Sequence, residues 1–228
     1  MLRGTLECSG EEEMLLIRDS ITREVVAVGS ETTAAEALAL CRVNRIRHLP
    51  VIKEGRLVDI ISDRDLCLAT PALGDSARSE ALGRLRVADE MVRDVATVHP
   101  EEPVEDAAMY EKIGCLPVVD REDLAGILTS SDMLRAFARL VGADEPGSRI
   151  EVSLPNRSGS LAEVVGFVSD KGVNFVSVLA SSEREDEDGE RVAVLRLATI
   201  NSKEVVEDLK VSGYWIRWPP AAPELGRA

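Results

Sequence analysis

Residues 48–66 read HLPVIKEGRLVDIISDRDL, and residues 115–133 read CLPVVDREDLAGILTSSDM. Both stretches begin with a residue followed by Leu-Pro-Val, pass through a charged turn into an apolar run, and end on Ser or Thr followed three positions later by Asp. One constant offset aligns them, so that His48 corresponds to Cys115 and Asp65 to Asp132. Self-similarity at a fixed offset indicates one structural unit built twice, so residues 1–140 are predicted to hold two copies of one fold.

Further upstream, the offset between the copies becomes larger. Val28 corresponds to Val98 and Ala37 to Ala107. The second copy is therefore predicted to lack three residues inside its first helix. Three residues are close to one helical turn, so the apolar face of that helix is roughly preserved.

Each copy is predicted to run strand, helix, strand, strand, helix. Thr32 and Thr33 offer an N-terminal cap for the first helix, and Gly55 lies in a turn of hairpin size. Ser62 caps the helix that begins with Asp63. The predicted elements are strand 25–28, helix 34–43 and strands 49–52 and 57–61, then strand 124–128 and helix 130–140, with a helical stretch around 79–91 between the copies.

A different pattern follows a Gly/Pro-bearing linker at 141–147. Ile150, Val152 and Leu154 alternate with polar residues, as in a strand with one buried face. The segment reads strand, helix, strand, strand, helix, strand, which is the ferredoxin-like order and makes the whole chain α+β. Its predicted strands are 150–154, 174–179, 192–197 and 214–218, its helices are 161–169 and 203–209, and 183–191 is a charged loop.

Charge and composition argue against several classes of function. The formal net charge of −14 disfavours a nucleic-acid groove and an anionic membrane surface. No apolar run reaches the ~18 residues of a membrane span. The four cysteines and two histidines show no metal-ligand spacing, and scattered thiols fit a reducing cytosol. The chain is predicted to be cytoplasmic, with no metal and with no nucleic-acid or membrane partner.

The element order and the motif of each copy resemble the CBS domain family. That family's nucleotide-ribose signature, Gly-hydrophobic-x-Thr/Ser-x-x-Asp, is complete at 126–132, whereas the first copy has Asp59 in place of the glycine. The resemblance implies a disc-shaped pair, the Bateman module, with two clefts. It also implies an adenine nucleotide (AMP, ADP or ATP) as regulatory ligand, with no cofactor required. Asp59 could repel a phosphate or point to solvent, and the sequence leaves both readings open.

The same residues suit a nucleotide on physical grounds. A Ser or Thr at a helix N-terminus presents a hydroxyl and free backbone N–H groups, which favour a phosphate. An Asp three residues later can accept both ribose hydroxyls, and Arg64 beside Asp65 supplies a fork for phosphate. Taken singly, such a pair is more often only a helix cap, and His48 is more often a packed histidine than a ligand. Their repetition at matched positions favours the ligand site.

The resemblance carries candidate ligand residues onto both copies. In the first cleft they are Thr22, Val25, His48, Pro50, Ser62, Arg64 and Asp65. In the second cleft they are Val95, Gly114, Cys115, Pro117, Thr129, Ser131 and Asp132.

The third segment resembles the ACT domain family. That family's ligand loop, Asp/Asn-x-x-Gly-x-Leu, is present at 156–161, and 172–175 fits a later part of its pattern. The resemblance implies that an amino acid or a similar small acid binds at this loop, because N–H groups at a helix start attract a carboxylate. A glycine turn with a serine cap is the simpler alternative, and Asn in place of Asp weakens a contact to an amino group. The implied ligand residues are Asn156, Gly159, Ser160 and Leu161.

A CBS pair followed by an ACT domain is the layout of the acetoin-utilisation regulatory protein (AcuB) family, and the likeness runs over almost the whole chain. It implies a non-catalytic, ligand-sensing homodimer that regulates acetoin catabolism through an enzyme of acetate or acetoin metabolism. The alternative is a structural, dimerising interaction module with empty clefts. An enzyme is not expected, because no catalytic constellation is legible in the sequence.

The domain boundaries follow from these patterns. Residues 1–13 lack any apolar signal core and are predicted to be a disordered tail, with Met14 as an alternative start. The predicted order is then a first CBS repeat at 14–70, a linker at 71–86, a second CBS repeat at 87–142, a linker at 143–148, an ACT domain at 149–219 and a tail at 220–228.

Overall fold

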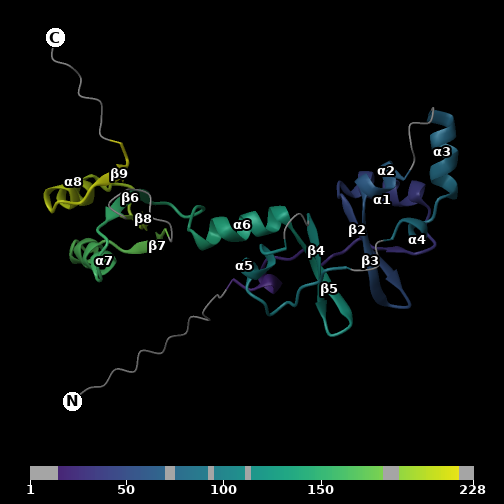
Figure 1. Cartoon of the computed structure of the whole chain (residues 1–228), viewed down its shortest axis with the longest axis horizontal. Helices are drawn as coiled ribbons and strands as arrows, with labels where there is room; N and C mark the ends of the chain where they lie inside the picture. Colours follow the sequence, from purple (N-terminus) through teal and green to yellow (C-terminus); the bar gives the residue numbers. More distant parts are fainter. Residues whose placement is uncertain (1–14, 70–74, 92–94, 111–113, 182–189, 221–228) are drawn as a thin grey trace, which may run out of the picture. The chain divides into compact units, whose positions relative to one another are not determined.

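The computed structural model describes residues 15–69, 75–91, 95–110, 114–181 and 190–220 (Figure 1). The predicted N-terminal tail, most of the C-terminal tail and most of the charged loop lie outside these residues. The chain divides into two compact units, residues 1–136 and 137–228, and each unit is described by itself.

The first copy of the repeat forms a three-stranded sheet with two helices. It contains β1 (Val28–Gly29), α1 (Ala34–Asn44), β2 (His48–Lys53), β3 (Arg56–Ser62) and α2 (Asp63–Leu68). β1 pairs with β2 in parallel, and β2 pairs with β3 in antiparallel. The strand predicted at 25–28 is wrong in its start, because the parallel pairing begins only at Val28.

Local sequence explains these elements. Thr33 and Glu36 form the capping box that starts α1, as the threonines predicted. Glu54 and Gly55 both have positive φ, which is the conformation of a tight hairpin turn between β2 and β3.

The second copy repeats this arrangement. It contains α5 (Val104–Ala107), β4 (Cys115–Asp120), β5 (Asp123–Thr129) and α6 (Ser130–Leu140). The parallel bridge between Val98 and Val118 reproduces the pair of Val28 with Val51, so the larger upstream offset and the smaller downstream offset are both confirmed. The predicted loss of three residues falls where α5 is only four residues long.

α3 (Asp75–Arg84) lies between the copies, and α4 (Val87–Glu90) begins the second copy. The helical stretch predicted around 79–91 is therefore interrupted. The reason is tertiary: Leu85 O accepts a hydrogen bond from Ala34 N at 2.9 Å, and Val87 N donates to Thr32 O at 2.9 Å. Because these backbone groups bond to the start of α1, they are not available to continue a helix.

Each copy of the repeat completes the core of the other. Ile17, in the short 3-10 helix Ile17–Asp19 at the start of the first copy, is fully buried in the second copy's core with Leu116 and Leu128. Val87, at the start of the second copy, is fully buried in the first copy's core with Leu49. Full burial of such a side chain contributes about 1.5–3 kcal/mol, so the exchange stabilises the pair as one body.

The second unit contains a four-stranded antiparallel sheet in the order β7-β8-β6-β9. The helices α7 (Ser160–Asp170) and α8 (Lys203–Val211) supply Val164, Val168 and Leu209 to one core with the apolar strand residues. The predicted ferredoxin-like fold is confirmed. The strands are β6 (Ser148–Leu154), β7 (Phe175–Ala180), β8 (Arg191–Leu197) and β9 (Ile216–Trp218), the last starting two residues later than predicted.

The segment after α6 is bonded to this sheet. Ser177 Oγ donates to Val141 O at 2.8 Å, and Arg196 Nη2 donates to Glu145 O at 2.9 Å. Gly142 is buried with a φ of +64°, a conformation that favours glycine. The predicted linker is therefore packed against the ACT-like sheet.

Gly126→Ala should destabilise the protein by about 1–3 kcal/mol through overpacking. A Cβ at Gly126 would lie 2.7 Å from Ile21 Cδ1 and 2.8 Å from Thr22 O, where the N-terminal segment bridges to β5. The measurement is the free energy of unfolding in urea. Gly83→Ala is the matched control, because Gly83 lies in α3 and no atom of the described residues, apart from its chain neighbours and the backbone of its own helix, lies within 4 Å of its Cβ position. The control should be neutral or stabilise by up to about 1 kcal/mol. Equal stability of the two variants would contradict the close approach.

Candidate functional site

The first-copy motif forms a capping box at the junction of β3 and α2. Ser62 Oγ donates to Asp65 Oδ2 at 2.5 Å, and Ser62 N donates to the same oxygen at 3.1 Å. Asp65 N donates back to Ser62 Oγ at 3.2 Å. Every hydrogen bond between the Asp65 side chain and another described residue therefore uses Oδ2, and Oδ1 is available to a ligand.

The second-copy motif repeats the same geometry at the start of α6. Thr129 Oγ1 and Thr129 N donate to Asp132 Oδ2 at 2.6 and 3.0 Å. Here the other oxygen is also engaged, because Arg135 Nη1 donates to Asp132 Oδ1 at 3.0 Å. The Asp132 side chain is only 11% exposed, whereas that of Arg135 is 70% exposed. Asp65 and Asp132 thus each cap a helix through Oδ2, and the predicted contact to a ligand must use Oδ1.

The backbone around the two motifs is equivalent. Asp63 N donates to Arg47 O at 2.8 Å, and the matching pair in the second copy is Ser130 N to Gly114 O at 3.2 Å. We call Arg47, His48, Ser62, Arg64 and Asp65 the first motif site. The second motif site is the matching set Gly114, Cys115, Thr129, Ser131 and Asp132.

The two motif sites approach each other through His48. A Cβ added at Gly114 would lie 3.2 Å from His48 Cε1 and 3.3 Å from His48 Nε2. Gly114 is therefore the residue that lets the imidazole of the first copy pack against the backbone of the second. The two motif sites are therefore in direct contact through His48 and Gly114.

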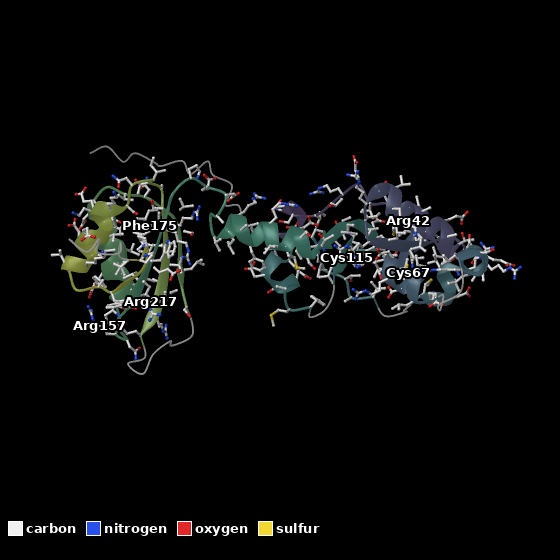
Figure 2. All side chains as sticks on the ribbon, turned by 90° about the horizontal axis from the view of Figure 1, so that it is seen from above. Arg42, Cys67, Cys115, Arg157, Phe175 and Arg217 are labelled. Carbon is white, nitrogen blue, oxygen red and sulfur yellow. The ribbon has the colours of Figure 1, made fainter. Side chains whose placement is uncertain are left out.

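The environment holds both of the matched side chains, His48 and Cys115, in their neutral forms. Burial lowers the pKa of His48, while the nearby carboxylates of Asp63 and Asp65 oppose that shift. Burial, together with the Asp132 carboxylate, raises the pKa of the Cys115 thiol to about 12. Cys115, labelled in Figure 2, is thus a neutral, buried thiol and not a thiolate nucleophile.

The other predicted residues are spread around the motifs. Pro50 and Pro117 are buried in β2 and β4 at matching positions. Val25 and Val95 are half-buried outside the strands, and Ser131 is exposed on α6.

The structure moves Thr22 to the other copy and decides between the two open readings of Asp59. Thr22 was predicted for the first cleft, but its N–H and C=O both bond to Ile127 at 3.0 Å, so the structure places it beside the second-copy motif. The reason is that the segment at the start of the first copy packs against the second copy. Asp59 does not point to solvent: it is 1% exposed, and its Oδ1 accepts from Ile60 N at 2.6 Å.

Arg47 is a candidate ligand residue that the sequence reasoning missed. It is exposed, its charge acts on His48, and its carbonyl oxygen accepts from the first residue of α2. The signal was present in the repeat, because Arg47 occupies the position that matches Gly114, a residue the prediction did select.

The second unit contains a cavity of about 680 Å³ beside the start of α7. All four residues predicted for the ACT ligand loop line this cavity: Asn156, Gly159, Ser160 and Leu161. Gly159 has a φ of +86°, so the loop conformation favours glycine. The first-turn N–H groups of α7 give this end of the helix a partial positive charge.

Two arginines of the cavity were not predicted, Arg157 and Arg191. Arg157, labelled in Figure 2, forms a bidentate ion pair with Glu163, which also accepts a hydrogen bond from Tyr214 Oη at 3.0 Å. These donors hold the pKa of Glu163 below its usual value. Arg191 forms no ion pair with another described residue. No described residue that lines the cavity carries a carboxylate, so its chemistry suits an anion.

Comparison with known proteins agrees with this architecture. The CBS domain family model matches residues 17–71 and 87–139, and the ACT domain model matches residues 148–212. A CBS domain-containing protein of Dictyostelium discoideum is 32% identical over 143 residues, which covers 59% of this chain and 99% of the relative. The chain belongs to the CBS domain family and carries an ACT domain after its two CBS domains.

Two solved structures are similar over about half of the chain. A protein from Vibrio cholerae, assigned to acetoin utilization (AcuB), is 32% identical with a TM-score of 0.49 and covers 58% of this chain and 96% of its own. CBSX2 in complex with AMP is 31% identical with a TM-score of 0.46 and covers 54% of this chain and 95% of its own.

The described residues contain no helix that is both long and apolar enough to span a bilayer. Within the same residues, no three His, Cys, Asp or Glu side chains are grouped so that they could hold a metal ion.

His48→Gln should reduce the loss of stability on mild acidification. Because the folded protein binds this proton less readily than the unfolded chain, His48 contributes stability above its unfolded pKa of about 6.5 and loses it as pH falls below that value. The measurement is the free energy of unfolding in urea between about pH 7.5 and 5.5. A slope as steep in the variant as in the wild type would contradict the burial of a neutral imidazole.

Proposed function

We propose that the protein is a non-catalytic, ligand-sensing regulator that binds an adenine nucleotide in the predicted clefts of its CBS pair. The observation that carries this proposal is the repeated cap geometry. In both copies a Ser or Thr and an Asp meet at a helix start, and the cap uses only one oxygen of each carboxylate. The second oxygen can accept ribose hydroxyls without loss of the cap.

The Oδ1 atoms of Asp65 and Asp132 differ in how readily a ribose can reach them. Asp65 is exposed and its Oδ1 is available. At Asp132, a ribose would replace Arg135, an exposed side chain that forms an ion pair with Oδ1 of the buried Asp132. The helix N-termini of α2 and α6 add N–H groups and partial positive charge, which suit a phosphate.

Regulation requires that the ligand favour one of two states. The contact between His48 and Gly114 couples the two motif sites. α6 begins directly after Thr129, and the residues that follow the helix are bonded to the ACT sheet by Ser177 and Arg196. We infer that ligand binding at Asp132 shifts α6 and so changes the ACT domain, which is allosteric regulation.

At the ACT domain we infer a small acid as ligand. Arg191 and the N-terminus of α7 line the cavity, which suits a carboxylate. An amino acid would leave its ammonium group without a described carboxylate in the cavity, so a simple acid fits better.

The cellular role follows from the AcuB-like layout by analogy. We propose a cytoplasmic homodimer that controls an enzyme of acetate or acetoin metabolism and so regulates acetoin catabolism. The exclusion of catalysis is part of the same proposal, and reproducible turnover of a defined substrate would contradict it.

A structural, dimerising module with empty clefts is the second candidate. Large apolar side chains are exposed on the helices of the CBS pair, among them Val43, Leu68 and Leu134. Exposed apolar side chains form an interaction surface when they are contiguous. This candidate predicts tight self-association and no thermal response to nucleotides.

The test of nucleotide binding is thermal unfolding of ligand-free protein with AMP, ADP, ATP or S-adenosylmethionine. A ligand at about 100 times its Kd should raise Tm by about 5–10 °C. Asp65→Ala or Asp132→Ala should abolish that shift. Each variant also loses a helix cap, at a cost of about 0.5–2 kcal/mol.

Glu36→Ala distinguishes the loss of a helix cap from the loss of a contact to the ligand. Glu36 makes the same capping box with Thr33 on α1, with bonds of 2.8 and 2.9 Å to Glu36 Oε2, but it belongs to neither motif site. This control should lose comparable stability and keep the full ligand-induced shift. The nucleotide assignment fails if wild-type protein shows no shift, or if the aspartate variants keep it.

The ACT assignment is tested with small carboxylic acids such as acetate, lactate and succinate. At least one should raise Tm, and Arg191→Gln should weaken its binding by about tenfold, because a charge-assisted hydrogen bond is lost. Arg149→Gln is the control, since Arg149 lies on β6 outside the cavity and pairs with Glu151. Equal acid affinity in both variants and the wild type would remove Arg191 from the site.

A further inference from the structure

Two reduced thiols share the core of the first CBS copy. Cys41 belongs to α1 and is one of the buried residues of that core, with 4% of its surface exposed. Cys67, labelled in Figure 2, belongs to α2 and packs half-buried against the same core. α1 and α2 are in contact with each other. The fold therefore brings together two cysteines that are well separated in the sequence.

The end of α1 is joined by backbone hydrogen bonds to the start of α2. Cys41 O accepts a hydrogen bond from Ile46 N at 2.9 Å, and the next residue, Arg47, accepts one from Asp63 N at 2.8 Å. Asp63 and Cys67 are four residues apart in α2, so they lie on one face of that helix.

This face of α2 is turned toward Cys41. Burial raises the pKa of the Cys41 thiol, and the Asp63 carboxylate and Cys67 add to the shift. Both members of the α2 face thus lie near the Cys41 sulfur. Together with the shared core, this makes Cys41 and Cys67 neighbours across the contact between α1 and α2.

The two thiols differ in access to solvent, which gives them different roles. Cys67 is half-buried, so a small oxidant can reach it. Cys41 is shielded, and its raised pKa keeps the thiol protonated at neutral pH. Cys115, in β4 of the second copy, is 2% exposed, and the group that acts on it is the Asp132 carboxylate and not a second thiol.

We propose that Cys41 and Cys67 form a redox modification site, at which hydrogen peroxide converts the two thiols into a disulfide that joins α1 to α2. The Cys67 sulfur attacks the peroxide, the O–O bond breaks, and the products are the Cys67 sulfenic acid and water. The Cys41 sulfur then attacks the Cys67 sulfur, so that the S–S bond forms and the second oxygen leaves as water. The two thiols lose two electrons in total, and the peroxide gains them.

The disulfide would act on the element that holds the first motif site. Asp65 caps α2 through Ser62, and Cys67 follows Asp65 in the same short helix. A covalent tie from Cys67 to α1 therefore restrains the helix that positions this aspartate. In a reducing cytosol such a disulfide is transient, which suits a sensor of oxidants. The modification site does not depend on the proposed binding of a nucleotide.

The experiment is peroxide treatment of the purified full chain, followed by alkylation under denaturing conditions, trypsin digestion and mass spectrometry. In the wild type, tryptic peptides 24–42 and 65–78 should be recovered as a disulfide-linked pair that dithiothreitol separates. Peptide 113–121, which contains the buried Cys115, should be recovered alkylated and serves as the internal control. The oxidised protein should run as a single chain on a non-reducing gel.

Two variants separate the roles of the thiols. Cys41→Ala should accumulate the Cys67 sulfenic acid, detected as its dimedone adduct, because the second thiol is missing. Cys67→Ala should leave peptide 24–42 alkylated, because Cys41 is shielded from the oxidant. Cys67 is only half-buried, so this arm remains informative if the variant at the buried Cys41 fails to fold.

Three results would overturn the inference. The first is oxidised wild-type protein without the linked pair, or with that link only between two chains. The second is an equal yield of the dimedone adduct at Cys67 in the wild type and in Cys41→Ala, because Cys41 would then not consume the sulfenic acid. The third is a link from peptide 24–42 to another cysteine in Cys67→Ala.

Discussion

The exchange of apolar segments between the two CBS copies is the constraint on which the rest of the first compact unit, residues 1–136, depends. Ile17 lies at the start of the first copy but is buried in the second core, and Val87 lies at the start of the second copy but is buried in the first core. Neither core is complete without residues from the other half of the pair. The two copies are therefore expected to fold together, and the motif sites are held in contact at His48 and Gly114.

The motif aspartates combine a structural and a proposed functional role in one side chain. One carboxylate oxygen of each completes a capping box, which orders the start of α2 or α6. That bond fixes the rotamer and leaves the second oxygen aimed away from the cap. A ligand site built in this way is preorganised, because the carboxylate does not lose further freedom when a ribose binds.

The ACT unit shows how a loop and a sheet make an acid-binding cavity. Gly159 gives the loop its positive φ, and the start of α7 and Arg191 of β8 face the same space. The segment after α6 is bonded to β7 and β8 through Ser177 and Arg196. The chain that follows α6 is therefore an ordered part of the ACT unit and not a loose tether.

Much of this architecture could be predicted from the sequence. The constant offset between the two motifs is visible in the sequence itself, and the capping residues Ser62 and Thr129, the βαββαβ order and the glycine of the ACT loop depend on short-range patterns. Local physics governs each of them, since caps, turns and apolar periodicity are set by residues a few positions apart. The predicted fold class and the pair of CBS domains followed by an ACT domain are confirmed.

Other features depended on contacts between distant residues. Only the tertiary structure placed Thr22 on Ile127, buried Asp59, broke the helix between Arg84 and Val87, and brought Arg191 into the ACT cavity. The sequence by itself determined the elements and their caps, because those interactions are local. The folded chain decided which copy each segment completes and which side chains share a site, because long-range packing and backbone pairing outweigh local preference.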